Sequence, residues 1–131
     1  MGSKNWKPES YSSVSPYLVV SDARRVIAFA KTVFGATELR RYDMPDGSIM
    51  HAELRIDDSV IMLGDGGPKY PPFPSLLHVY VDDVDAVYRR SIEAGATPVE
   101  APRTREGDPD RRGSVKDPCG NTWSIATQLP Q

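Results

Sequence analysis

Phe34-Gly35-Ala36-Thr37 and Ala94-Gly95-Ala96-Thr97 are two copies of one short phrase, and they stand about half of the 131-residue chain apart. Each copy ends an apolar run with a glycine, the residue that most readily takes the left-handed conformation found just after a helix. Because the helix stop occurs twice at this separation, the sequence predicts a duplicated folding unit.

The residues before each glycine support a duplication. In the first copy a strand-like run, 14–20, is followed by Asp22 as a helix N-cap and by apolar residues at helical spacing over 26–34. In the second copy a strand over 76–81 and an apolar stripe over 84–92 repeat this order. Each half is therefore predicted to begin with a strand and a helix.

Three short extended segments follow each glycine. They are 37–42, 48–56 and 59–63 in the first half, and 97–100, 111–116 and 122–128 in the second. The sequence thus predicts an α+β fold of two tandem βαβββ modules, forming one eight-stranded mixed sheet with a shared core. The predicted parts are an N-terminal tail 1–12, a single domain 13–128 (module one 13–64, a glycine- and proline-rich linker 65–75, module two 76–128) and a C-terminal tail 129–131.

Composition favours one soluble globular domain. Charged residues make up 26% of the chain and the net charge is −2, which is too balanced for a surface built to bind nucleic acid. No apolar run approaches the roughly 20 residues of a membrane span. The single cysteine, Cys119, has no partner for an internal disulfide. We therefore expect a cytoplasmic protein without nucleic-acid or membrane partners.

The paired βαβββ pattern, with a V-x-D motif opening each helix and the turn DPCGN over 117–121 before the last strand, resembles the vicinal oxygen chelate superfamily. That superfamily includes glyoxalase I, bleomycin-type resistance proteins and extradiol dioxygenases. The resemblance covers about residues 13–128. It implies strands curled around a cavity that a second copy of the chain often completes, so we expect a homodimer that binds a small molecule.

In that family a divalent metal is usually held by one residue near the start of the first strand and one in the last strand of each module. The resemblance places these positions at Ser15, Met62, Leu76 and Ser124. None of these side chains is a usual ligand for a divalent ion. We therefore expect no cofactor, and a protein that sequesters an aromatic or antibiotic-like organic ligand, as bleomycin-type resistance proteins do.

Strand alternation selects the side chains that face the predicted cavity. The ligand-binding candidates are Tyr17, His51, Met62, Phe73, Tyr80 and Ser124, with Phe73 reaching in from the linker as a lid. Glu53 and His78 are the candidate catalytic residues, because a buried carboxyl with a raised pKa or a histidine near neutral pH exchanges protons. The alternative for Glu53 is a surface ion pair with Arg55 or a neighbouring cation.

An enzyme is the main rival interpretation. In one version His51, Glu53 and His78 hold zinc, nickel, manganese or iron and carry out glyoxalase-like lyase or isomerase chemistry, or dioxygenation. In another, Glu53 or His78 alone abstracts a proton without metal. A third alternative is a purely structural domain, whose own side chains would fill the cavity.

Two other features have structural explanations. Trp123 is expected in the core, since a large aromatic on a strand is most often buried. The cationic cluster Arg103, Arg105, Arg111 and Arg112 is interleaved with aspartate and glutamate, which favours local salt bridges over a site for an anionic ligand.

Overall fold

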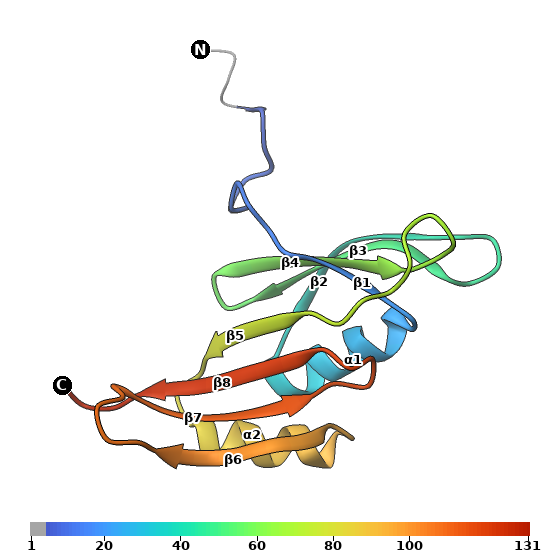
Figure 1. The fold of residues 1–131 in the computed structure, drawn as a ribbon. Coiled ribbons are helices and arrows are strands. Elements are labelled where there is room, and N and C mark those ends of the chain that lie inside the picture. Colours follow the sequence, from blue (N-terminus) through green and yellow to red (C-terminus); the bar gives the residue numbers. More distant parts are fainter. Residues whose placement is uncertain (1–4) are drawn as a thin grey trace.

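The structure is a computed structural model that describes residues 5–131, so the first four residues of the predicted N-terminal tail lie outside the described part. Its elements are β1 (Tyr17–Val20), α1 (Ala23–Phe34), β2 (Thr37–Asp43), β3 (Ile49–Ile56), β4 (Ser59–Asp65), β5 (Leu76–Tyr80), α2 (Val84–Glu93), β6 (Thr97–Thr104), β7 (Asp110–Lys116) and β8 (Thr122–Gln128) (Figure 1). Each half is a strand, a helix and three strands, which confirms the predicted pair of βαβββ modules.

The strands form two four-stranded mixed sheets, one in each module, in place of the single eight-stranded sheet that the sequence predicted. The first sheet has the order β1-β4-β3-β2, and the second has the order β5-β8-β7-β6. In each module the first strand runs parallel to the last, and the other neighbours are antiparallel. We call β1–β4 with α1 module one, and β5–β8 with α2 module two. Curling of the strands around a cavity stays a prediction.

The two helices begin and end as the repeated phrase predicts. The carboxylates of Asp22 and Asp83 accept hydrogen bonds from backbone N–H groups three residues further on, which caps both helix starts. Gly35 and Gly95 have φ angles of 66° and 100°, a region that favours glycine. Within residues 5–131, neither helix is long and apolar enough to cross a bilayer.

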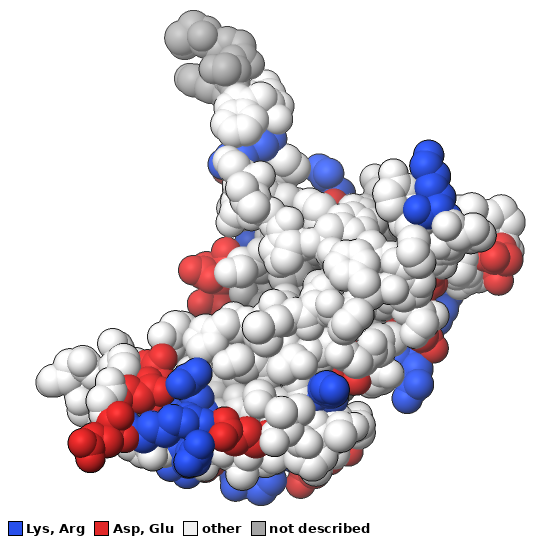
Figure 2. All heavy atoms as spheres, viewed as in Figure 1, with Lys and Arg blue, Asp and Glu red and all other residues white. Residues whose placement is uncertain are grey.

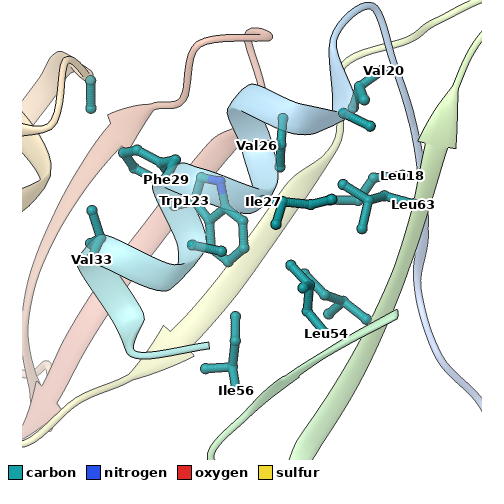
Figure 3. Close-up of a cluster of buried hydrophobic side chains, with 14 of the residues drawn as sticks. Leu18, Val20, Val26, Ile27, Phe29, Val33, Leu54, Ile56, Leu63 and Trp123 are labelled. Atoms are coloured by element: carbon teal, nitrogen blue, oxygen red, sulfur yellow. The ribbon is translucent and has the colours of Figure 1, made fainter. Parts of the chain in front are cut away.

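The two modules share one hydrophobic core, part of which Figure 3 shows. Trp123 of β8 is buried, and its ring centroid lies 4.8 Å from that of Phe34 and 6.4 Å from that of Phe29, both on α1. Arg90 of α2 also donates two hydrogen bonds to the carbonyl oxygen of Val33, at 3.1 and 2.6 Å. The prediction of Trp123 as a core residue is confirmed, and it joins the two halves.

The other side of each sheet is open to solvent. In β1, Leu18 and Val20 are buried, whereas Tyr17, the first residue of the strand, is 43% exposed. In β5, Leu76 and Tyr80 are 75% and 60% exposed. The alternation of strand side chains therefore divides each module into a core face and an open face, and the open faces carry the predicted site residues.

β4 runs further than the sequence pattern indicated. Gly64 and Asp65, placed at the module–linker boundary by the sequence, pair with Val19 and Val20 of β1 and so belong to the sheet. The Asp65 carboxylate accepts hydrogen bonds from the first N–H groups of α1 and β3, both at 2.7 Å. Glycine is needed at position 64, because a Cβ there would lie 2.5 Å from the Met50 carbonyl oxygen.

β6 also runs past its predicted end at residue 100 and reaches Thr104. Two prolines, Pro98 and Pro102, lie within it. They are tolerated because β6 is the edge strand of its sheet and its pairing with β7 contains register shifts.

Candidate functional site

Four predicted site residues meet on the open face of module one. Tyr17 of β1 stands opposite Met62 of β4, and Met62 stands opposite Glu53 of β3. His51, two residues before Glu53, lies on the same face of β3 and contacts both Glu53 and Tyr17. These side chains therefore lie on one face of the sheet, as strand alternation in the sequence predicted.

These residues form a continuous hydrogen-bonded chain that also includes Tyr11. The Tyr11 hydroxyl donates to Glu53 Oε1 at 2.5 Å, and His51 Nε2 lies 2.7 Å from Glu53 Oε2. Tyr17 Oη lies 3.0 Å from His51 Nδ1. Since a carboxylate only accepts, His51 Nε2 carries the hydrogen, and in the neutral ring Nδ1 accepts from the Tyr17 hydroxyl.

Glu53 is the buried charge at the centre of this chain, with 3% of its surface exposed. Burial alone would raise its pKa. Hydrogen bonds from His51 and Tyr11, together with the charges of His51 and Arg40, instead hold the pKa below its usual value. The raised pKa predicted for a buried Glu53 is wrong, because donors surround the carboxylate. The alternative of an ion pair with a neighbouring cation holds for Arg40 of β2, whose Nε atom lies 3.9 Å from Glu53 Oε1, although the carboxylate is buried and not at the surface.

The two phenols beside Glu53 keep their protons. Burial and the nearby carboxylate raise the pKa of Tyr11 and of Tyr17. Near neutral pH the arrangement is therefore one ionised carboxylate with hydroxyl and imidazole donors around it.

Two hollows flank this chain. One, of about 300 Å³, is lined by Tyr17, Val19, Met50, Gly64, Asp65 and Tyr70. The other, of about 460 Å³, lies between the segment before β1 and the sheet, and is lined by Trp6, Lys7, Pro8, Tyr11, Ser12, Ser13, Ser15, Arg40, Glu53 and Met62. In this second hollow the Ser15 hydroxyl oxygen is buried and has no hydrogen-bond partner among the described residues.

Module two holds a separate group of predicted residues. His78 Nδ1 lies 3.1 Å from Ser124 Oγ, and the His78 ring meets the Tyr80 ring edge to face at 4.9 Å. The Tyr80 hydroxyl donates to the buried Asp110 at 2.8 Å. Phe73 of the linker is exposed and lines neither hollow of module one. The lid role predicted for Phe73 stays a prediction.

The metal positions carried over from family resemblance do not provide usual ligands. Ser15 and Met62 offer a hydroxyl and a thioether, Leu76 is aliphatic, and Ser124 bonds to His78. Within residues 5–131 no three His, Cys, Asp or Glu side chains are grouped so that they would hold a metal ion. In one chain, His51 and Glu53 lie in module one and the third residue of the alternative set, His78, lies in module two.

The four arginines of the cationic cluster form local salt bridges, as predicted. Arg103 and Arg105 pair with Glu100, Arg111 pairs with Asp85 at 2.9 Å, and Arg112 pairs with Asp108 at 2.7 Å. Figure 2 shows basic and acidic groups interleaved at the lower left, near the ends of β6 and β7, while the middle of this view is largely uncharged.

Sequence reasoning missed Tyr11 and Arg40 as parts of the site. Tyr11 precedes the first strand, so no strand or helix periodicity selects it. Arg40 lies beside a register shift between β2 and β3, which removes the simple alternation that would assign its face. Its Nε atom lies 3.9 Å from Glu53 Oε1.

Comparisons with known proteins agree with this fold. The Glyoxalase/Bleomycin resistance protein/Dioxygenase superfamily model matches residues 12–125. An uncharacterized protein of Mycobacterium tuberculosis is 41% identical over 124 residues, covering 86% of this chain and 72% of that one.

Two solved structures are similar over most of their length. TioX from Micromonospora sp. ML1 is 27% identical, with a TM-score of 0.70 and coverage of 92% of this chain and 98% of that one. TnmS3, an antibiotic binding protein from Streptomyces sp. CB03234, is 23% identical, with a TM-score of 0.69 and coverage of 91% and 100%.

Proposed function

This chain belongs to the glyoxalase/bleomycin resistance protein/dioxygenase superfamily, and from that premise we propose that it binds and sequesters a small organic molecule without a metal ion. The binding face is the open face of module one, where Tyr17, His51, Glu53 and Met62 lie together. The metal-free part of the proposal rests on the chemistry of the side chains at the four ligand positions, which suit no divalent ion.

The observation that carries the proposal is the hydrogen-bonded chain of Tyr11, Glu53, His51 and Tyr17 between two hollows. Apolar and aromatic walls supply affinity for an organic guest, while a few fixed polar groups orient it. Here the walls include Met62 and the tyrosine rings, and the polar group is the buried carboxylate with its donors. TnmS3 has the same fold and binds an antibiotic, so the fold is compatible with an antibiotic-like guest.

A second copy of the chain is part of the proposal. Leu76 and Tyr80 of module two are mostly exposed, and so is much of Tyr17 in module one. An open face with such side chains is normally covered by a partner, which here would enclose the ligand between two chains. Light scattering after gel filtration should give twice the mass of one chain, and Leu76→Asp should shift the protein toward the mass of a single chain.

The test is a screen of small aromatic compounds by NMR, following backbone amide shifts. We expect saturable shifts that cluster on β1, β3 and β4, and a loss of affinity of about tenfold or more in Tyr17→Ala, as for removal of a well-packed aromatic contact. Tyr88→Phe, on α2, is the matched control and should bind as the original protein does. No saturable site in the screen would favour a purely structural domain instead.

Elemental analysis of protein purified without an affinity tag or chelator tests the metal-free part. Zinc, nickel, manganese or iron at one ion per chain would overturn it and direct attention to His51, Glu53 and His78. Absence of metal, and no uptake when metal is added, is the result that we expect.

A proton-transfer enzyme is the second candidate, and one observation favours it. His51 is oriented by a buried carboxylate on one ring nitrogen and contacts a hydroxyl with the other, the order of groups found where a base activates a hydroxyl. Under this alternative His51→Ala or Glu53→Gln abolishes turnover of the ligand found in the screen. Under the leading proposal the same changes only weaken binding.

A further inference from the structure

Tyr11 sits in the site of module one in the manner of a bound ligand. Its phenol hydroxyl donates to the buried carboxylate of Glu53 at 2.5 Å. The guanidinium carbon of Arg40 lies over its ring at 5.5 Å from the ring centroid, and that of Arg55 lies over it at 5.9 Å. These contacts recognise both parts of a phenol: the two guanidinium groups lie over the ring, and the carboxylate accepts a hydrogen bond from the hydroxyl.

The segment that carries Tyr11 is not part of either sheet. It precedes β1, and outside the Tyr11 side chain it makes few polar contacts with the modules. Arg55 donates to the Ser10 carbonyl oxygen at 3.0 Å, and the Met62 N–H donates to the Pro16 carbonyl oxygen at 2.9 Å, directly before β1. Two further bonds, from Lys7 to the Ser13 hydroxyl at 3.2 Å and from the Tyr11 N–H to the Pro8 carbonyl oxygen at 3.3 Å, lie within the segment itself. Segments with few buried contacts open at low free-energy cost, so Tyr11 can leave without unfolding the modules.

The site would remain shaped for the same chemistry after Tyr11 leaves. Glu53 Oε1 would lose its donor, although Arg40 and Arg55 would remain. The hollow of about 460 Å³ beside them is also lined by Met62 and by Ser15, whose buried hydroxyl oxygen has no partner among the described residues. A buried carboxylate oxygen without a donor is unfavourable, so the vacated position selects a ligand that supplies one.

We propose that Tyr11 is a displaceable internal stand-in for the ligand, and that the site takes a hydroxylated aromatic molecule in its place. The ligand hydroxyl donates to Glu53 Oε1, its ring lies under the two guanidinium groups, and a second polar group reaches the Ser15 hydroxyl. This inference rests on the proposed function, whose ligand class it names.

The experiment uses p-cresol, which is the tyrosine side chain without its backbone, and the full-length variant Tyr11→Ala. We expect this variant to bind one p-cresol per chain at least about tenfold more tightly than the original protein, because a hydrogen bond to a charged group is worth roughly 1.5–3 kcal/mol and the internal competitor is gone. Titration calorimetry or NMR measures the affinity. 4-Methylanisole, with the same ring and no donor, should bind at least about tenfold more weakly.

Three further variants sharpen the result. Tyr11→Phe keeps the ring but not the hydroxyl, so p-cresol should bind to it with an affinity between those of the original protein and Tyr11→Ala. Adding Glu53→Gln to Tyr11→Ala should remove most of the gain. Val99→Ala, on β6 of module two, is the control and should bind p-cresol as weakly as the original protein.

Equal p-cresol affinity in the original protein and in folded Tyr11→Ala would overturn the inference, as would equal binding of 4-methylanisole. If Tyr11→Ala does not fold, the inference is decided by Tyr11→Phe, which must bind p-cresol more tightly than the original protein. Compounds from the aromatic screen that shift β1, β3 and β4 while p-cresol fails would retain the proposed function and reject only this ligand class. Failure of every compound in every variant would reject both.

Discussion

Where module one places Tyr17 opposite Met62, module two places His78 opposite Ser124 in the matching pair of parallel strands. The neighbouring antiparallel strand carries Glu53 in module one, and Ser114 stands in the same register in module two. The backbone pattern has been repeated, but the chemistry has not. Module one has a buried carboxylate at this register and module two has a serine hydroxyl, so the two halves differ in side-chain chemistry while agreeing in fold.

The core shows a second difference between the modules. Trp123 of module two packs against Phe29 and Phe34 on the helix of module one, whereas the matching register of module one carries the smaller Ile61. Two of the side chains that join the halves, Trp123 and Arg90, therefore come from module two.

The largest loss of stability is expected from removing the Trp123 side chain, which joins the two modules. Trp123→Ala should lower the free energy of unfolding by about 3–5 kcal/mol, since it leaves a large cavity next to α1. Urea unfolding followed by circular dichroism measures it. Ile61→Ala is the matched variant and should lower the free energy of unfolding by less. In the original protein, the two modules should unfold together in one transition. Two separate transitions would show that the modules do not depend on a shared core.

The next largest loss of stability is expected from changing Glu53, the buried carboxylate of module one, where module two has Ser114. Glu53→Gln should lower the free energy of unfolding near neutral pH by about 1–3 kcal/mol, because it weakens hydrogen bonds that two donors make to a buried carboxylate. Ser114→Ala, at the matching position of module two, should change it by less than about 0.5 kcal/mol. Equal effects from both variants would mean that the polar chain of module one does not stabilise the fold.

At low pH the stabilisation that Glu53 gives to module one should disappear. The pKa of Glu53 in the folded protein lies below the ordinary value of 4.5, so the ionised carboxylate stabilises the fold above that pH and its contribution is lost as the pH falls below it. The stability gap between the original protein and Glu53→Gln should therefore shrink between pH 7 and acid conditions near pH 3. Unfolding curves at a series of pH values measure it, with Ser114→Ala as the variant whose gap stays constant. A gap that does not change with pH would contradict the assignment.

The smallest effect is expected from the surface charges of module two. Arg111→Ala removes a half-exposed pair with Asp85 and should lower the free energy of unfolding less than the Trp123 and Glu53 changes do. Because salt screens such pairs, thermal unfolding should show the difference shrinking at high ionic strength. A cost of several kcal/mol that does not respond to salt would show that Arg111 has a structural role beyond the ion pair.

Much of the fold was predictable because local rules decided it. The left-handed glycines, the aspartate caps and strand alternation each depend on a few neighbouring residues, so Gly35, Asp22 and the face of Glu53 could be assigned from sequence. Trp123 was also placed in the core correctly, though its partner helix could not be named, since contacts between modules depend on tertiary packing.

The site was less predictable, for physical reasons that differ from residue to residue. Tyr11 lies outside any periodic element, and Arg40 follows a register shift. The predicted direction of the Glu53 pKa shift was wrong because the shift depends on Tyr11 and Arg40 as well as on His51. Tyr11 and Arg40 come from two other segments, about which the pattern of a single strand contains no information.

The pairing of each module's first strand with its last has a consequence for the order of synthesis. During translation β1 and α1 emerge long before β4, the strand with which β1 pairs, and Trp123, the packing partner of Phe29 and Phe34, is made later still. β8 comes after all the other described strands, and it is both the parallel partner of β5 and the strand whose Trp123 ring packs on α1. A chain that ends before Trp123 would lack both contacts and would expose apolar side chains of β5 and α1, a ready substrate for chaperones and proteases.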